Sequence, residues 1–223
     1  MKKIYSILSS LLLKKNLHLI RSLSYSEKKP LFNTAHLDYV KVGLLELCAR
    51  EIYAKKIAGS VAELGVYKGG FAKYINQAFP DKKLYLFDTF EGFDNKDILA
   101  EKNRGFQNTS QDFSDTNIDI VLDKMKTKDQ CIVKKGRFPD TTKDLIDEQF
   151  CFVSIDADLY EPTYQGLQFF YSRLISGGYI IVDDYNNKLY KGAREAIINF
   201  CTEQKISFTP IPDIGGGVVI SKF

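Results

Sequence analysis

Two apolar runs in the second half of the chain end in clusters of aspartates, and this pattern constrains the fold more than any other. The runs span residues 150–155 and 179–182, and the carboxylates that follow them are Asp156, Asp158, Asp183 and Asp184. In an open α/β sheet, ligands bind beyond the carboxyl ends of the strands, so neighbouring strands would bring all these carboxylates to one edge. Such crowding raises carboxylate pKa values unless a cation lies between them, and a hard divalent ion such as Mg²⁺ suits these oxygen ligands. Aspartates also occur in ordinary loops, but two such clusters at successive strand ends favour a metal site.

A glycine turn in the first half of the chain indicates a second ligand site. Residues 60–66 are typical of a short strand and lead into a glycine-rich turn and a helix that begins near residue 71. Glycine lets the backbone approach a ligand closely, and a helix N-terminus presents unpaired N–H groups. The turn is not the G-x-G-x-x-G dinucleotide fingerprint, because Glu63 occupies its first glycine position, where an acid suits a cationic group such as an amine. The next apolar run, 84–87, ends at Asp88, and an acid there commonly binds ribose hydroxyls.

Five separated motifs carry a family resemblance. In chain order they are E-L-G-V-Y-K-G-G (63–70), L-F-D-T-F-E-G-F (86–93), G-R-F-P-D-T (136–141), I-D-A-D-L-Y-E-P-T (155–163) and S-G-G-Y-I-I-V-D-D-Y (176–185). Together they resemble the macrocin O-methyltransferase family, whose members methylate sugar hydroxyls with S-adenosylmethionine and the help of Mg²⁺. The resemblance runs from about residue 40 to the C-terminus and is specific, because the motifs agree in order and spacing. The family serves several pathways, so the resemblance does not identify the acceptor.

The resemblance implies a fold and a set of roles. The fold is that of a class I methyltransferase: an α/β protein with a Rossmann-like, mostly parallel sheet, an antiparallel last strand and helices on both faces. Glu63 and Gly65 are expected near the methionine part of the cofactor, and Asp88 at its ribose. The full set of expected cofactor-binding residues is Glu63, Gly65, Tyr67, Gly69, Asp88 and Arg137. The expected metal ligands are Asp156, Asp183 and Asp184, and the expected general base is Asp158.

Several of these roles have alternatives. Arg137 is expected either over the cofactor or as an exposed cation, and Tyr67 either contacts the cofactor or caps its loop. Asp158 could equally be a metal ligand, with Asp184 one shell further out. In that case the base lies elsewhere, and His36 is the first candidate.

Three functions compete at this stage. In the leading one, Mg²⁺ on the aspartates binds adjacent hydroxyls of a sugar and lowers the pKa of the one that is methylated. In the second, the D-x-D sequence holds the Mg²⁺ of a nucleotide-sugar in a glycosyltransferase, which would leave residues 63–70 and Asp88 without a role. The third is a non-catalytic module that keeps the fold alone, and the complete set of carboxylates counts against it.

Length and composition agree with one α/β domain. The chain has 223 residues and a net charge of +3, which is too small to indicate nucleic-acid binding. Its four cysteines (Cys48, Cys131, Cys151 and Cys201) lack the spacing of a zinc site. We expect reduced thiols, a cytoplasmic location and a homo-oligomer.

Residues 1–36 are expected to form a helical extension, which packs on the domain, acts as a lid or contacts another subunit, and the methyltransferase domain is expected at 37–223. Lysines followed by the apolar run 4–13 are typical of a signal peptide, but no small-residue cleavage site follows. The run is also too short to span a bilayer. We therefore expect an amphipathic helix that packs on the domain or on a second subunit, with peripheral membrane contact and a secretory signal as the alternatives.

The remaining elements follow from hydrophobic periodicity. The expected strands are 61–66, 83–88, 130–135, 150–155 and 179–183, followed by a hairpin of 206–211 and 217–222. The expected helices are 37–58, 70–78, 117–125, 162–174 and 191–204. The polar region 92–116 is expected to be a long loop of functional importance.

Overall fold

The structure is a computed structural model that describes residues 2–15, 17, 38–106 and 112–223. The chain divides into two compact units, residues 1–33 and 34–223. The first unit contains helix α1 (Lys2–Leu13), on which Ile7, Leu8 and Leu11 are exposed. Within the described ranges, no helix combines the length and apolar character needed to cross a membrane.

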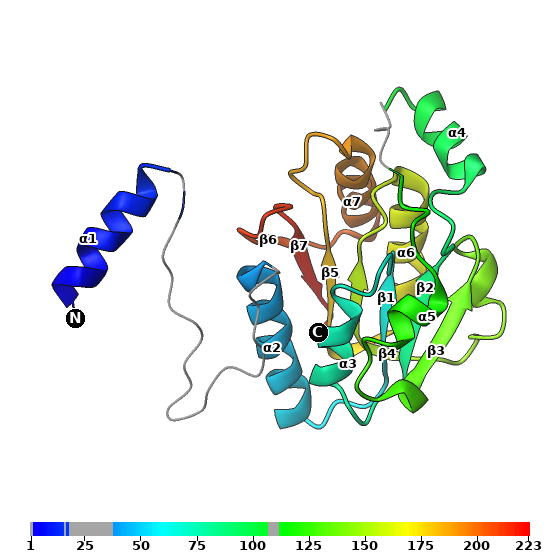
Figure 1. Cartoon of the computed structure of the whole chain (residues 1–223). Coiled ribbons are helices and arrows are strands. Elements are labelled where there is room, and N and C mark those ends of the chain that lie inside the picture. The colour runs from blue at the N-terminus through cyan, green and yellow to red at the C-terminus, as the bar shows by residue number, and fades with distance from the viewer. Residues whose placement is uncertain (1, 16, 18–37, 107–111) are drawn as a thin grey trace. The chain divides into compact units, whose positions relative to one another are not determined.

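A seven-stranded sheet forms the centre of the second unit (Figure 1). Its strands are β1 (Ser60–Leu64), β2 (Leu84–Asp88), β3 (Cys131–Lys135), β4 (Phe150–Ile155), β5 (Leu174–Val182), β6 (Thr209–Pro210) and β7 (Val218–Ser221). The order across the sheet is β3-β2-β1-β4-β5-β7-β6. The pairs from β3 to β5 are parallel, whereas β7 is antiparallel to both β5 and β6. The predicted mostly parallel sheet with an antiparallel last strand is confirmed.

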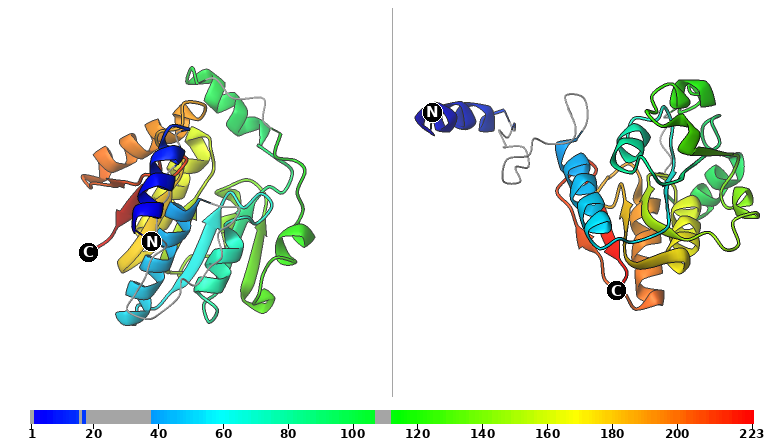
Figure 2. Two further views of the ribbon diagram at one scale, coloured as in Figure 1. Left: turned by 60° about the vertical axis from the view of Figure 1, so that its left-hand side comes forward. Right: turned by 90° about the horizontal axis from the view of Figure 1, so that it is seen from below.

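Helices cover both faces of this sheet (Figures 1 and 2). They are α2 (Tyr39–Ala54), α3 (Ala72–Ala78), α4 (Asn95–Asn103), α5 (Ile118–Leu122), α6 (Tyr160–Arg173) and α7 (Lys191–Gln204), with short 3₁₀ turns at Lys128–Gln130 and Asp140–Thr142. Helices α2 and α3 contact each other and the sheet on one face. Helix α6 contacts β4 and β5 on the other face and packs against α7 and α4.

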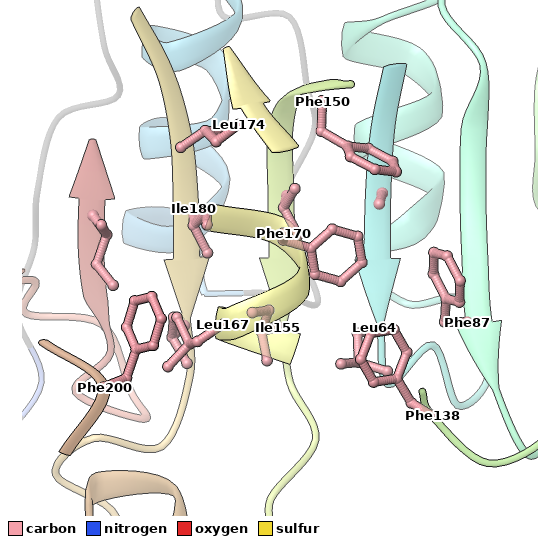
Figure 3. Packing of buried hydrophobic residues seen from close by; sticks show 14 of the residues in the cluster. Leu64, Phe87, Phe138, Phe150, Ile155, Leu167, Phe170, Leu174, Ile180 and Phe200 are labelled. Atoms are coloured by element: carbon pink, nitrogen blue, oxygen red, sulfur yellow. The ribbon is translucent and has the colours of Figure 1, made fainter. Parts of the chain in front are cut away.

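The core between the sheet and α6 is rich in phenylalanine (Figure 3). The ring of Phe170 on α6 packs edge-on against Phe150 of β4, with ring centroids 5.1 Å apart, and stacks on Phe138 at 5.7 Å. Every residue of β1 and β4 is buried, as expected for central strands covered on both faces. Packing in this core therefore holds in place β1 and β4, the strands whose carboxyl ends form the site.

Helix α4 corrects the expectation of a long loop at 92–116. Asp94 caps this helix by accepting a hydrogen bond from the Lys96 N–H group at 2.8 Å. The buried residues of α4 are Asp97 and Glu101, so its inner face carries carboxylates and not the apolar stripe by which a helix is recognised in a sequence. Residues 107–111, from the same predicted loop, lie outside the described part of the chain.

The predicted hairpin near the C-terminus was too long on its first strand. Strand β6 is only Thr209–Pro210. Most of the residues missing from the predicted strand are at its start, because helix α7 is still being closed there: Lys205 has a φ of 55°, and the Ile206 N–H group donates to the Cys201 carbonyl at 3.0 Å. Elsewhere the boundaries shift: β5 begins at Leu174, earlier than predicted, and α6 begins at Tyr160.

Candidate active site

The carboxyl ends of the central parallel strands meet at one edge of the sheet, where a cavity of about 320 Å³ opens. Strand β2 lies on one side of β1 and β4 lies on the other, so the winding direction of the chain reverses between β1 and β4. Ligands of open α/β sheets bind at such a point. The predicted site residues that line the cavity are Glu63, Gly65, Tyr67, Asp88, Arg137, Asp156 and Asp158. Gly69, Asp183 and Asp184 lie outside the lining of this cavity.

Glu63 is a buried carboxylate in the cavity wall. It lies within β1 and is 2% exposed, and its Oε2 atom has no hydrogen-bond partner among the described residues. Burial raises the pKa of Glu63 well above its usual value, although Lys41 opposes the shift. An acceptor that is buried without a partner is costly. The site therefore fits a ligand that brings a donor, such as an ammonium group, to this wall.

Asp88 organises the glycine turn that follows β1. Its Oδ2 atom accepts hydrogen bonds from the N–H groups of Val66 and Tyr67, both at 2.7 Å, and its Oδ1 atom accepts one from Phe90 N–H at 2.7 Å. Tyr67 has a φ of 48°, in the left-handed region, and Asp88 supports this turn. The Thr89 hydroxyl lies 3.4 Å from Asp88 Oδ1 but donates more closely to the Gly92 carbonyl, so the fourth of about four lone-pair positions on Asp88 can accept from a ligand hydroxyl.

Gly65 is required by a close approach between two loops. Its φ is 85°, and a Cβ atom at this position would lie 1.9 Å from the carbonyl oxygen of Asp156. Gly69 has a packing role instead, because a Cβ there would lie 3.1 Å from the Val121 side chain on α5. The turn after β1 is thus in direct contact with the loop that carries the aspartates.

Three aspartates form a group that could hold a cation. Asp156, Asp158 and Asp184 each present a carboxylate oxygen, and these atoms lie within 4.8 Å of one another. Asp158 and Asp184 have φ values of 60° and 62°, in the left-handed region that non-glycine residues adopt uncommonly. Burial, with Asp156 and Asp184 nearby, raises the pKa of Asp158 well above its usual value. The donor set, all carboxylate oxygens, fits Mg²⁺.

Asp183, one of the expected metal ligands, lies beside a lysine instead of in that group. Lys41 on α2 donates to Asp183 Oδ2 and to Asp156 Oδ2, the latter at 3.1 Å. Lys41 is 8% exposed, and its ammonium lies 4.5 Å from the centre of the Phe71 ring. Burial alone would lower the pKa of Lys41, but Asp156 and Asp183 outweigh it and raise that pKa above its ordinary value.

Lys41 is a site residue that the sequence interpretation missed. A signal was present, because the buried residues Leu45, Cys48 and Ile52 follow it at helical spacing and place Lys41 on the inner face of α2. A lysine on an apolar helix face is seldom buried unless it is paired. His36, the alternative base, lies outside the described residues.

Arg137 fastens α4 to the loop after β3. Its Nη2 and Nε atoms lie 2.6 and 3.0 Å from Asp97 Oδ1, and Asp97 is buried. The Arg137 side chain is 20% exposed and lines the cavity, so the alternative of an exposed cation is wrong. Asp97 also lines the cavity, so the Arg137–Asp97 pair forms part of its wall.

Sheet order, helix arrangement and the position of the cavity together define a class I methyltransferase fold. Residues 21–221 match the family model of macrocin-O-methyltransferase (TylF), and the chain belongs to this family. The chain is thus an O-methyltransferase, as the sequence motifs predicted. The glycosyltransferase and the non-catalytic module find no support in the comparisons.

Two relatives illustrate the family. The chain is 29% identical over 177 residues to mycinamicin III 3''-O-methyltransferase of Micromonospora griseorubida, covering 73% of this chain and 68% of the relative. It is 25% identical over 185 residues to 8-demethyl-8-(2,3-dimethoxy-alpha-L-rhamnosyl)-tetracenomycin-C 4'-O-methyltransferase of Streptomyces olivaceus, covering 77% and 69%.

A solved structure supports the fold. The O-methyltransferase NovP superposes on this chain with a TM-score of 0.65 at 23% sequence identity. The superposition covers 82% of this chain and 80% of the NovP chain. At this identity the likeness shows the fold alone.

Proposed function

We propose that the chain transfers a methyl group from S-adenosylmethionine to a hydroxyl of a sugar or sugar-containing acceptor, with Mg²⁺ bound at the aspartates. One observation carries the proposal: the cavity wall holds a buried acid, Glu63, whose Oε2 atom has no hydrogen-bond partner among the described residues. This wall adjoins the group of three carboxylates through the contact of Gly65 with Asp156. The family and the sugar-modifying relatives support the choice of reaction and acceptor.

The cofactor would lie along the ends of β1 and β2. Bound S-adenosylmethionine supplies a methyl group on a positively charged sulfur. Glu63 would accept hydrogen bonds from the cofactor's amino group, which satisfies its unpartnered oxygen. Asp88 would accept from the ribose hydroxyls while it keeps the Val66–Tyr67 turn in place. Arg137 and Asp97 would line another part of the cavity wall.

The acceptor would lie between this cavity and the aspartates. Bound Mg²⁺ supplies Lewis acidity toward neighbouring hydroxyl oxygens. Asp156 and Asp184 would hold it, together with Asp183, as the family resemblance implies, or Asp158, as the spacing of the oxygens favours. With Asp158 as the base, its carboxylate would take the proton of the acceptor hydroxyl that is methylated.

A binding and activity experiment tests this function. Calorimetric titration with S-adenosylhomocysteine should show binding with or without Mg²⁺, whereas methyl transfer to a panel of glycosides and nucleotide-linked sugars should stop in excess EDTA and return with Mg²⁺. Binding of UDP in place of S-adenosylhomocysteine would overturn the methyltransferase proposal. Full activity in excess chelator would show that the aspartates serve another purpose.

Cellular location and assembly remain predictions. A cytoplasmic homo-oligomer, with the N-terminal extension packing on the domain or a second subunit, stands as expected from the sequence, and peripheral membrane contact by the exposed apolar residues of α1 is the alternative. The oligomeric state is measured by sedimentation velocity.

A further inference from the structure

We propose that helix α1 binds the surface of a membrane that is rich in anionic lipids. Its apolar residues would enter the boundary between the headgroups and the acyl chains, and the lysines at its ends would lie near lipid phosphates. The partner is therefore a lipid surface and not another protein. This role is independent of the proposed methyl transfer, so either can fail without the other.

Helix α1 carries an exposed apolar stripe. Ile7, Leu8 and Leu11 recur about one helical turn apart, so they share one side of the helix, and they are 64%, 46% and 55% exposed. Ser9 and Ser10 fall outside this stripe. Apolar side chains that gather on one side of a helix, with polar residues on the rest, are typical of a helix that lies in a membrane interface.

Positive charge is concentrated beside this stripe. Lysine pairs at 2–3 and 14–15 lie at the two ends of the helix, and the second pair is exposed. Residues 1–33 contain seven Lys or Arg and one Glu, and so carry a net charge of +6. Because the whole chain carries +3, residues 34–223 carry −3. A charge asymmetry of this size indicates that the basic segment binds an anionic surface.

A lipid surface fits both features of the segment, whereas other partners fit only one. Nucleic acid would attract the lysines but gives the leucines of the stripe nothing to pack against in its phosphate backbone. A second copy of the segment could cover the stripe, but it would bring the lysines of both copies together, and like charges oppose that contact. An anionic membrane offers an apolar layer and negative charge at one surface. With 12 residues, α1 is too short to span the hydrocarbon layer and would lie along its surface.

The test is co-sedimentation of the full chain with two kinds of vesicle: phosphatidylcholine alone, and phosphatidylcholine with phosphatidylglycerol in a ratio of about 2:1. The protein should bind the mixed vesicles, and binding should fall steeply as salt is added, because salt screens the lysines. Leu8→Glu with Leu11→Glu should abolish binding, since charge replaces the stripe. Lys14→Gln with Lys15→Gln should weaken binding by roughly 30-fold, or about fivefold for each lysine.

The matched controls lie in the second unit. Ile146→Glu places a charge at an apolar position that is 75% exposed, and Lys126→Gln with Lys128→Gln removes two exposed lysines. Both should leave vesicle binding unchanged. Every variant should bind S-adenosylhomocysteine as the unmodified protein does. Loss of that binding throughout, with vesicle binding intact, would count against the proposed reaction and not against the membrane contact.

Absence of binding to the mixed vesicles, or equal binding to both kinds, would overturn the proposal. Two further measurements on Leu8→Glu with Leu11→Glu identify what covers the stripe in that case. Dissociation of a dimer, seen by sedimentation velocity, would assign the stripe to a second copy. A lower melting temperature in a monomer would assign it to packing within the chain.

Discussion

Glu101 of α4 accepts a hydrogen bond from the backbone N–H group of Tyr160 at 2.9 Å. Tyr160 is the first residue of α6, so a carboxylate from another helix satisfies one of the unpaired N–H groups at this N-terminus. Asp158 lies only two residues earlier in the chain. Helix α4 thereby holds the segment that carries the proposed base.

Replacement of Glu101 should destabilise the protein. Glu101 is 2% exposed, so Glu101→Ala leaves a buried N–H group unpaired and should lower the free energy of unfolding by about 1–3 kcal/mol. Urea denaturation measures the change. Glu91→Ala is the control, because Glu91 forms an exposed pair with Lys135 whose loss should cost less than about 1 kcal/mol. Equal stability of the two variants would show that the cap contributes nothing.

Glu63 and Asp88 should both be needed for cofactor binding. Glu63→Ala and Asp88→Ala each remove an acceptor from a buried donor, and each should weaken S-adenosylhomocysteine binding by about 1–3 kcal/mol, or roughly 5- to 150-fold. Calorimetry measures the affinities, with Glu91→Ala again as the control. If neither variant changes the affinity, the cofactor has been placed in the wrong part of the cavity.

Asp158→Asn separates a base from a metal ligand. Asparagine keeps the shape but cannot take a proton, so the chemical step should fall by about 10²–10⁴-fold at every Mg²⁺ concentration. Asp156→Ala, by contrast, removes a ligand, and its loss should be partly recovered at high Mg²⁺ because water can fill the vacated position. Single-turnover methyl transfer, scanned over Mg²⁺, distinguishes them. Recovery of Asp158→Asn by metal alone would make Asp158 a ligand and send the search for the base to His36.

Gly65→Ala should be far more damaging than Gly70→Ala. Alanine at 65 would place its Cβ 1.9 Å from the Asp156 carbonyl oxygen at a φ of 85°, so the loops must separate. A Cβ at Gly70 meets nothing within 4 Å. We expect Gly65→Ala to lower the melting temperature by several degrees, corresponding to about 1 kcal/mol or more, and Gly70→Ala to leave it nearly unchanged. Similar melting temperatures would contradict the close approach.

The sequence predicted the part of the site that strand direction controls. Glu63, Asp88, Asp156 and Asp184 come together because the carboxyl ends of parallel strands share one edge, and the motifs mark those ends. The spacing of the aspartates in the sequence could not predict that Asp158 lies within the group of three carboxylates and Asp183 lies outside it. Alternation of side chains holds only while a strand continues, and at Asp158 the φ of 60° shows that the chain has left β4.

The contribution of the helices was harder to predict. Lys41 reaches the aspartates only because α2 packs across β4 and β5. The hydrophobic pattern of α2 shows which face is buried, but it does not show how the helix lies on the sheet. Helix α4 went unrecognised because its buried positions are Asp97 and Glu101, whose partners, Arg137 and the Tyr160 N–H group, are distant in sequence. Both omissions involve buried charges whose pairing is tertiary.

The contact of Gly65 with the Asp156 carbonyl has a thermodynamic meaning for the two ligands. A hydrogen bond from the Asp156 N–H group to the Leu64 carbonyl, at 2.8 Å, also joins the two segments, so a shift of one loop disturbs the other. Linkage then requires reciprocity: whatever factor S-adenosylhomocysteine applies to Mg²⁺ affinity, Mg²⁺ must apply to S-adenosylhomocysteine affinity. A titration that varies one ligand alone would therefore attribute to one loop a binding free energy to which both loops contribute.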